Sequence, residues 1–321
     1  MLKYALGRLV ELIPVFFLCL LLIFLIVHAA PGDPVLYLYG QHISSGEELQ
    51  RLRAQYGLDQ PLLARFLVYL GSLARGDLGR SISTGHPVGQ VIARHLPPTL
   101  LLMLTALVLA VGGGVLLGAV AARRPNTVTD SALMLLTLIG YSIPTFLLGL
   151  LLILILSVHV PLFPTFGMTT LGQDYTGMRR AIDVIHHLTL PAIVVAVWYL
   201  AIYARITRVS LIGVLREPYV ASARAKGLSE WTVTFHHALR NAMLPLVTNL
   251  GLQLGSMVTG AIVTETLFAW PGIGYLSYTA LLQRDYPMLV GIFVISSVCV
   301  LVANLLTDLA YAMCDPRIRL R

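Results

Sequence analysis

Two histidine pairs and a glycine-rich run are the residues of this chain whose types and spacing first suggest chemistry. The pairs at 186–187 and 236–237 have no cysteine at ligand spacing, so their pattern argues against a metal site. The run "GGGVLLG" at 112–118 has the glycine content of a phosphate loop, but no lysine follows it and its neighbours are apolar. Gly114 and Gly118 within it are instead typical of close helix packing.

Motifs for catalysis are also missing from the sequence. It contains no G-x-x-x-x-G-K-[ST] motif, so we expect any ATP used with this protein to bind to another chain. It has no HExxH, no paired aspartates within an apolar run and no serine beside a plausible base, which disfavours an intramembrane hydrolase. The sequence therefore predicts a protein that is not itself an enzyme and that binds no cofactor or metal of its own.

Glu265 and the glycines before it are the remaining candidates for a role inside an apolar stretch. Gly251, Gly255 and Gly260 either let a neighbouring helix approach closely or leave room along a substrate path. Packing is favoured for the first two, which leaves Gly260 as the candidate for the path. Glu265 is either an ordinary buried or interfacial acid or a carboxylate near the mouth of that path.

These residues lie in a chain with the composition of a helical membrane protein. Of its residues 57% are hydrophobic and 12% are charged, about half of the ~25% that is usual in soluble domains. Apolar runs near the length of a membrane span alternate with polar segments, and a soluble domain could not cover its surface with such a sequence. Six spans are expected, at about residues 9–28, 99–122, 131–158, 188–208, 241–266 and 288–311, and the third has Pro144 as a point where it can bend.

Six spans place both termini on the same side of the membrane. Thirteen of the 22 Lys and Arg residues fall on that side, which makes it cytoplasmic by the positive-inside rule. The formal net charge of +7 then follows from the topology. No basic patch with interleaved aromatic residues points to a nucleic-acid partner.

The largest polar segment, residues 31–97, is expected outside the cell. "SSGEELQRLRAQYG" and "QPLLARFLVYLGSLARG" predict two short amphipathic helices. They form either a packed lid on the membrane domain or a surface for an external partner. A third apolar stripe, Val88, Val91 and Ile92, is expected to lie along the membrane interface before the second span.

The stretch "EPYVASARAKGLSEWTVTFHHALRNAMLP", residues 217–245, is cationic and rich in small residues although it lies between two spans. The Glu-Pro pair at its start marks the beginning of a helix, and Gly227 is expected to end this helix with a positive φ. Ser229 offers a second N-cap, and Pro245 should kink the helix that follows. A short helix of small side chains with added positive charge suits insertion into a groove of another protein. The alternative is a helix that rests on anionic lipid.

The same stretch resembles the cytoplasmic loop of ABC-transporter permeases. "ARAKGL" followed by "HALRNAMLP" is similar in particular to the B-type membrane subunit of the dipeptide/oligopeptide/nickel importer family. The resemblance covers nearly the whole chain and includes, in order, "PGDP" at 31–34, "YGLDQPL" at 56–62, "GDLGRSIS" at 76–83, "GYSIPTF" at 140–146, "ETLFAWPGIG" at 265–274, "RDYP" at 284–287 and "DPRIR" at 315–319. Two features depart from the general permease pattern: Ala221 stands where a Glu is usual, and the motif proline comes late, as Pro245.

The resemblance implies an all-α membrane protein with the fold of a type I ABC importer permease, in which an external helical insertion follows the first of six transmembrane helices. Residues 1–30 would form the N-terminal anchor helix, 31–97 the insertion, and 98–321 a five-span permease core with a cytoplasmic coupling loop at 209–240. Such a loop docks a coupling helix into a cleft of the ATPase. The residues that match it are Glu217, Tyr219, Ala221, Ala223, Arg224, Ala225, Lys226, Gly227 and Leu228.

The implied partners are a homologous second permease subunit, two ATPase subunits or domains that hold ATP and Mg, an external solute-binding protein, and the lipid of a bacterial inner membrane. The implied function is inward transport of dipeptides and oligopeptides. Nickel, a metal chelate and glutathione remain alternative cargoes, because the family shares its scaffold among them. A secondary transporter driven by an ion gradient is the alternative from another class, although Glu11, Asp130 and Asp308 fall near span ends rather than mid-membrane.

The topology predicts opposite accessibility for Ser45 and Ser229. In a background without the three native cysteines, a single cysteine at position 45 should react with an impermeant thiol reagent applied from outside. A cysteine at position 229 should react only from the cytoplasmic side. Labelling of both positions from the same side would contradict the six-span topology.

Overall fold

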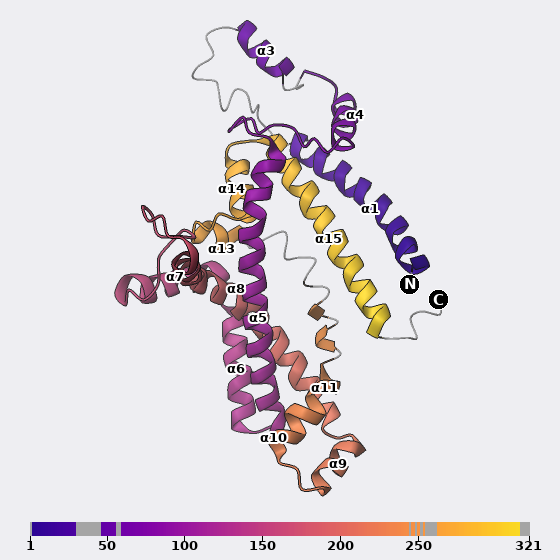
Figure 1. Ribbon diagram of the computed structural model, residues 1–321, viewed down its shortest axis with the longest axis vertical. Coiled ribbons are helices and arrows are strands. Elements are labelled where there is room, and N and C mark those ends of the chain that lie inside the picture. The colour runs from indigo at the N-terminus through magenta and orange to yellow at the C-terminus, as the bar shows by residue number, and fades with distance from the viewer. Residues whose placement is uncertain are drawn as a thin grey trace. The chain divides into compact units, whose positions relative to one another are not determined.

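The protein is described by a computed structural model, which covers residues 2–29, 46–55, 59–243, 245–247, 249–250, 253 and 262–314. Within these ranges the regular structure is helical apart from one isolated bridge between Arg80 and Pro87. Three helices in them are long and apolar enough to cross a membrane, and a bent pair of helices makes a fourth candidate. The chain divides into two compact units, a first of Met1–Thr99 with Pro271–Arg321 and a second of Leu100–Trp270 (Figure 1).

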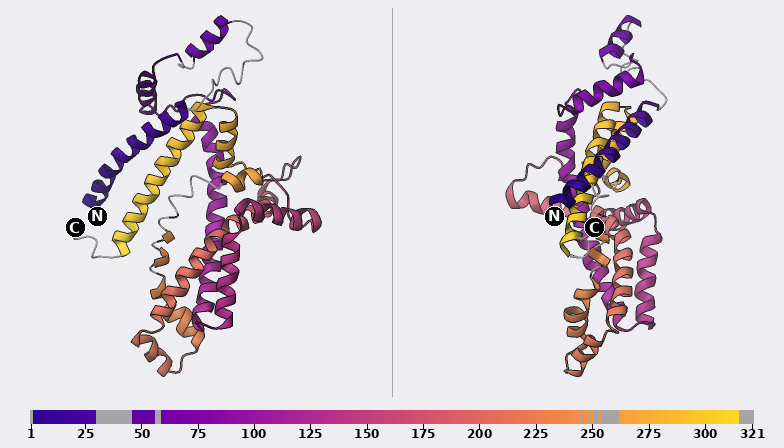
Figure 2. Two further views of the ribbon diagram at one scale, coloured as in Figure 1. Left: turned by 180° about the vertical axis from the view of Figure 1, so that it is seen from behind. Right: turned by 90° about the vertical axis from the view of Figure 1, so that its right-hand side faces the viewer.

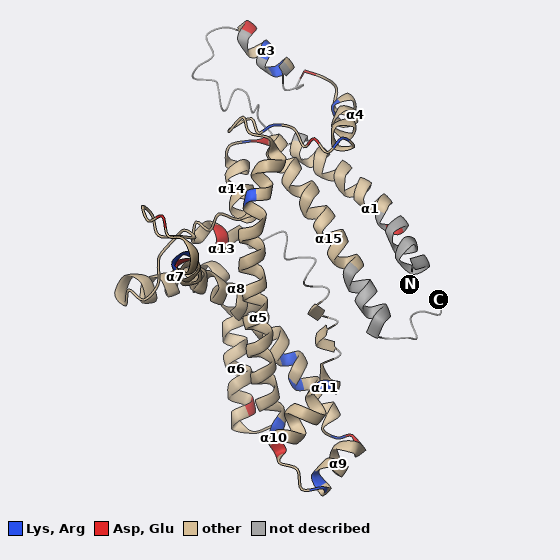
Figure 3. Ribbon diagram, in the orientation of Figure 1, with Lys and Arg blue, Asp and Glu red and all other residues tan. Residues whose placement is uncertain are grey.

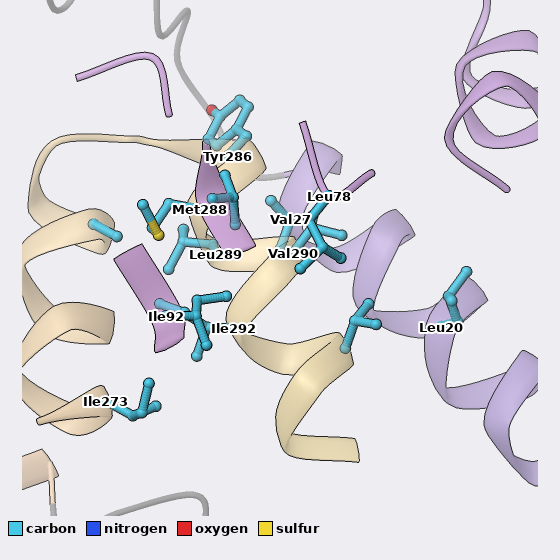
Figure 4. Packing of buried hydrophobic residues seen from close by; sticks show 13 residues of the cluster. Leu20, Val27, Leu78, Ile92, Ile273, Tyr286, Met288, Leu289, Val290 and Ile292 are labelled. Atoms are coloured by element: carbon cyan, nitrogen blue, oxygen red, sulfur yellow. The ribbon is translucent and has the colours of Figure 1, made fainter. Parts of the chain in front are cut away.

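In the first unit the two ends of the chain form a helix pair. Helix α1 (Leu2–Ala29) and helix α15 (Tyr286–Cys314) lie side by side (Figure 2). Val27 of α1 packs beside Val290 of α15 in the buried cluster that Figure 4 shows. The short helices α3 (Gly46–Gln55), α4 (Leu62–Leu73) and α14 (Ile273–Leu282) complete this unit.

Helix α4 is one of the two amphipathic helices predicted in the polar segment, and it packs against α1. The rings of Phe24 and Phe66 lie with centroids 5.2 Å apart. Phe66, Leu70 and Leu73 are partly buried against the cluster, whereas Leu62, on the same face of the helix, is 44% exposed. The first of the two predicted helices is α3.

Val88 and Ile92 do not form a separate interfacial segment, so that prediction was wrong. They are the first turns of helix α5 (Val88–Arg123), which continues through Pro97 and Pro98. Both are buried in the cluster of the first unit, where Gly291 of α15 leaves room for the side chain of Val88. An apolar stripe identifies a helix face that avoids water, but it does not show whether lipid or protein covers that face.

Asp285 joins two of the sequence motifs in the first unit. Its buried carboxylate accepts hydrogen bonds from the hydroxyls of Ser81 and Ser83 and from the backbone N–H of Ile82 and Met288. It therefore caps the start of α15 and holds the loop that carries "GDLGRSIS". The motif "RDYP" supplies the acceptor and the serine motif the donors.

In the second unit α5 continues beside α6 (Val128–Ser142) and α8 (Gly177–Val214). The third predicted span breaks where its proline predicted a bend. Helix α7 (Thr145–Ile153), followed by the π-helical turn η1 (Leu154–His159), leaves the direction of α6 by 96°. Pro144 stands at this break, where it cannot donate a backbone hydrogen bond. Helix α13 (Ile262–Leu267) packs on α7 and α8.

The fifth predicted span, 241–266, lies mostly outside the described residues. Helix α11 (Leu239–Ala242) ends before Pro245, as expected if this proline interrupts the helix. Gly251, Gly255 and Gly260 are among the residues that the structure does not describe.

The contact of α5 with α8 depends on glycines 114 and 118. A Cβ added to Gly114 would lie 2.6 Å from the Cβ of Tyr203 and 2.9 Å from the carbonyl oxygen of Leu200. A Cβ added to Gly118 would meet the carbonyl oxygen of Ala204 and would lie 2.7 Å from the Cβ of Thr207. These distances are too short for real carbon contacts, so only glycine permits this approach. The close packing predicted for both glycines is confirmed.

Gly118→Ala should therefore destabilise the protein by about 1–3 kcal/mol, because overpacking against a backbone forces α5 and α8 apart. Gly112→Ala is a matched control on the same helix, since its added Cβ would meet nothing within 4 Å. That control should keep or raise stability, by up to ~1 kcal/mol from helix propensity. Thermal unfolding of the purified variants in detergent measures both, and equal melting temperatures would contradict the packing argument.

Candidate functional site

The short helix predicted between the fourth and fifth spans is present as α9 (Pro218–Ala225). Glu217 precedes it in an extended conformation and Pro218 occupies its first turn, where a missing N–H is tolerated. Gly227 follows its end with a φ of +77°, in the left-handed region that favours glycine. Ser229 then caps α10 (Glu230–Thr232) by accepting a hydrogen bond of 3.2 Å from the N–H of Thr232. These boundaries and caps were predicted correctly.

One face of α9 is buried against the chain's own helices. Val220 is fully buried and Ala223 is 8% exposed. They belong to an apolar cluster formed by α5, α8, α9, α11 and the π-helical turn η2 (Val233–Ala238). Its buried members are Ala119, Ala122, Leu211, Val220, Ala223, Val233, Ala238 and Ala242. An eight-residue helix is marginal in isolation, so this cluster holds α9 in place.

The placement of Ala223 corrects one expectation about the small residues of α9. Ala221, Ala223 and Ala225 were expected to permit close approach to a partner. Ala221 and Ala225 are exposed, whereas Ala223 faces the cluster below the helix. The close approach at Ala223 therefore takes place within the chain itself.

Two polar side-chain contacts tie the exposed side of this loop together. The amide nitrogen Nδ2 of Asn241 donates a 2.7 Å hydrogen bond to the hydroxyl of Tyr219. Arg224 donates from Nε and Nη2 to the two carboxylate oxygens of Glu230, at 2.8 and 3.2 Å. These hydrogen bonds lower the pKa of Glu230, so the pair stays ionised at neutral pH. It is solvent-exposed, and such pairs contribute about 0–1 kcal/mol.

The end of α5 also contacts this loop. The guanidinium carbon of Arg123 lies 5.7 Å from the ring centroid of Trp231, in a cation–π arrangement. The Trp231 ring packs in turn on Phe235, with centroids 4.0 Å apart. Arg123 is a contact that no local sequence pattern could indicate.

The exposed surface of the loop combines cationic and apolar side chains. Of the nine predicted coupling residues, those exposed are Glu217, Tyr219, Ala221, Arg224, Ala225, Lys226, Gly227 and Leu228. Trp231, which the sequence prediction left out, is 55% exposed beside them. Figure 3 shows charged residues at α9 and α10 and at the adjacent ends of α5 and α6, whereas the middle parts of these two helices are mostly free of charge. An exposed tryptophan next to a cationic helix is typical of a binding surface.

The two residues predicted for a substrate path have different outcomes. Gly260 lies outside the described residues. Glu265 lies in α13 with a fully buried side chain, and its carbonyl oxygen accepts a 2.8 Å hydrogen bond from the N–H of Trp270. The chain turns directly after α13, where Ala269 has a φ of 45°. The structure thus places Glu265 as a buried acid, and its part in a path stays a prediction.

The histidine pairs have local contacts. Nε2 of His186 lies 2.6 Å from the carbonyl oxygen of Leu162, and Nδ1 of His187 lies 2.9 Å from that of Asp183. Within the described ranges no group of three or more His, Cys, Asp or Glu residues is placed to hold a metal ion.

Comparison with known proteins identifies the family. The model for "Binding-protein-dependent transport system inner membrane component" matches residues 114–320, and the model for the N-terminal part of such membrane components matches residues 1–103. The chain belongs to this family. It is therefore a membrane component of a transport system, which the motif resemblance predicted.

Relatives of this permease match it from end to end. It is 41% identical to the oligopeptide transport system permease protein AppB of Bacillus subtilis, over 99% of both chains. It is 40% identical to the dipeptide transport system permease protein DppB of Escherichia coli K12, again over 99% of both chains. A di/tripeptide transport system permease protein of Pseudomonas aeruginosa is 39% identical over the same shares.

The two faces of α9 predict different results for two alanine replacements. Ala223→Trp should disrupt the cluster under the helix, with a loss of stability of about 1–3 kcal/mol from overpacking. Ala221→Trp places the same bulk on the exposed face and should change stability by less than about 0.5 kcal/mol. Limited proteolysis of the loop and thermal unfolding of the isolated permease would measure the difference. Equal protease resistance of the two variants would contradict the assigned faces.

Proposed function

We propose that this chain is the membrane-spanning permease subunit of an ATP-driven importer of dipeptides and oligopeptides. The observation that carries the proposal is its identity of about 40%, over 99% of both chains, with permeases of oligopeptide and dipeptide transport systems. This match favours peptides over nickel, metal chelates or glutathione as the cargo. It also favours an ATP-driven system over a secondary transporter, because the matched family consists of components of binding-protein-dependent systems.

In the proposed topology six helices span a bacterial inner membrane, with both termini in the cytoplasm. The described helices supply three spans and a bent fourth, and the apolar stretches of residues 9–28 and 241–266 supply the other two. Residues 31–97 then lie outside, where the external solute-binding protein delivers the peptide. A homologous second permease would complete the path, and two ATPase subunits would hold ATP and Mg.

We infer that α9 is the helix that docks on an ATPase. Three observations support this role. The helix is preformed on its own cluster, so docking requires little ordering. Its C-cap residue Lys226 is exposed, as are the apolar side chains of Leu228 and Trp231 that follow it in the chain. It belongs to the loop 209–240, which the positive-inside rule places in the cytoplasm.

A helix resting on anionic lipid is the competing role for α9. That role needs one continuous apolar face directed to the membrane and cationic residues at its border. In α9 the apolar residue Val220 is buried against the chain's own helices, together with Ala223. The exposed side of the helix is mixed in character, which suits a protein groove better than a bilayer.

The test is peptide uptake by proteoliposomes that contain the whole complex of both permeases and the ATPases, with the binding protein supplied outside. Uptake of a labelled dipeptide should require ATP on the ATPase side and should persist when a protonophore removes the proton gradient. Ala225→Trp on the exposed face of α9 and Lys226→Glu at its exposed C-cap should each reduce ATPase association and uptake at least about tenfold, as side chains in the centre of an interface do.

Arg75→Glu is the matched control, since it also reverses an exposed positive charge but lies in the proposed external segment. It should leave association and ATP dependence unchanged. Uptake driven by a gradient without ATP would refute the proposed energy source. Full ATPase association in both α9 variants would instead assign α9 to the lipid surface.

A further inference from the structure

We propose that the ion pair of Asp130 and Arg208 is the joint through which a displacement of α9 reaches α6 and α7. Asp130 and Arg208 would thus be positioning residues of the transport reaction. This inference rests on the proposed docking of α9 on an ATPase. The pair lies within the second unit and joins the first turn of α6 to the last part of α8.

The geometry of the pair is bidentate. Nε of Arg208 lies 2.6 Å from Oδ1 of Asp130, and Nη2 lies 2.6 Å from Oδ2. Oδ2 also accepts a 2.8 Å hydrogen bond from the N–H of Asn126, whose φ of 62° marks the turn between α5 and α6. The carboxylate, which is buried, thus fixes three segments at once: the turn, the start of α6 and α8.

The backbone of Arg208 is itself held by α5. A Cβ added to Gly118 would lie 3.1 Å from the backbone nitrogen of Arg208. Leu211, three residues further along α8, is fully buried in the cluster with Val220 and Ala223 of α9. The same stretch of α8 therefore shares a buried cluster with α9 through Leu211 and is hydrogen-bonded to α6 through Arg208. A movement of α9 that shifts this stretch must act on Asp130.

Asp130 is buried and the side chain of Arg208 is 23% exposed, so this ion pair is a costly way to add stability, because desolvation of the carboxylate offsets much of the attraction. The pair does fix the orientation of α6 relative to α8, since the planar guanidinium matches a carboxylate in one orientation. Apolar side chains at the same place would allow α6 and α8 to slide. The bidentate pair makes the two helix ends move together, which is a property that transmission requires.

The elements that follow α6 connect the ion pair to α13, the helix with the buried Glu265. Helix α6 leads through the break at Pro144 into α7. Gly149 of α7 packs against the side chain of Leu267, and α13 lies on both α7 and α8. This is the helix that carries Glu265. A displacement of α6 is thereby delivered to the part of the second unit where Glu265 is buried.

The experiment measures ATP hydrolysed per peptide imported in the assembled complex. Asp130→Asn removes the charge but keeps the shape, and it should raise this ratio roughly tenfold, within the 5- to 150-fold range that is usual for coupling between sites. Arg208→Lys keeps the buried charge balanced but loses the bidentate geometry. It should raise the ratio to a smaller extent while the complex assembles normally.

Arg205→Gln is the control, because Arg205 is an exposed arginine on the same helix one turn earlier. Its ratio should equal that of the wild type. If the pair only stabilised the fold, the variants would give fewer assembled complexes but an unchanged ratio in each. Should Asp130→Asn fail to assemble, the double variant Asp130→Asn with Arg208→Gln avoids an unpaired buried charge and should show the same raised ratio.

The results separate this inference from the proposed function. A wild-type ratio in both Arg208→Lys and the double variant would overturn the role of the ion pair, even if α9 variants uncouple the complex. Loss of the proposed function would appear differently, as wild-type uptake that does not depend on ATP. In that case the wild-type complex would not be driven by ATP, and the role assigned to the ion pair of Asp130 and Arg208 would be refuted together with the proposed function.

Discussion

Helices α5 and α8 meet without side chains between them at Gly114 and Gly118, and the rest of the second unit depends on this contact. Backbone atoms of α8 occupy the places where Cβ atoms of α5 would otherwise lie. The approach brings the last turns of both helices close enough to share one apolar cluster with α9. In a membrane the hydrophobic effect does not drive helices together, so packing of this kind supplies much of the association.

Helix α9 is a short element that is fixed by burial on one side and exposed to solvent on the other. Eight residues do not form a stable helix alone. Val220 and Ala223 give α9 its position by burial, and Gly227 ends it by adopting a conformation that other residues avoid. The exposed side then carries cationic and apolar residues. Proteins commonly place binding residues on such segments, held by a rigid scaffold.

Buried carboxylates define positions in both units of this mostly uncharged chain. In the first unit Asp285 receives hydroxyl and backbone donors and fixes the loop of residues 76–87 to the start of α15. In the second unit Asp130 receives Arg208 and the N–H of Asn126. A buried charge is unfavourable unless its hydrogen bonds are made, so each of these residues permits few arrangements of its surroundings. Apolar packing alone would allow more of them.

The glycine contact, helix α9 and the buried carboxylates all occur in a chain that belongs to a family of transport components. Its relatives match it over 99% of both chains. The proposed coupling through α9 and the proposed joint at Asp130 use different parts of the second unit. One faces the solvent and the other lies between α6 and α8.

The sequence by itself determined the features that depend on neighbouring residues. Pro144 predicted the break between α6 and α7, Glu217 and Gly227 predicted the limits of α9, and Ser229 predicted the next cap. These signals act through the dihedral angles and hydrogen bonds of a few adjacent residues, so a linear pattern contains them. The apolar runs predicted a membrane protein for the same reason, since span length is a local property.

Only the tertiary structure decided which surfaces meet. The stripe at Val88 was expected to face a membrane interface, yet it is covered by α15 and its neighbours. Ala223 was expected on an exposed face and lies on a buried one. Asp130 lies 78 residues from its partner Arg208 along the chain. The periodicity of apolar residues shows that a helix face must be buried, and a charged residue in an apolar segment shows that it needs a partner. Which segment buries the face, and which residue pairs with the charge, depends on packing between distant parts of the chain.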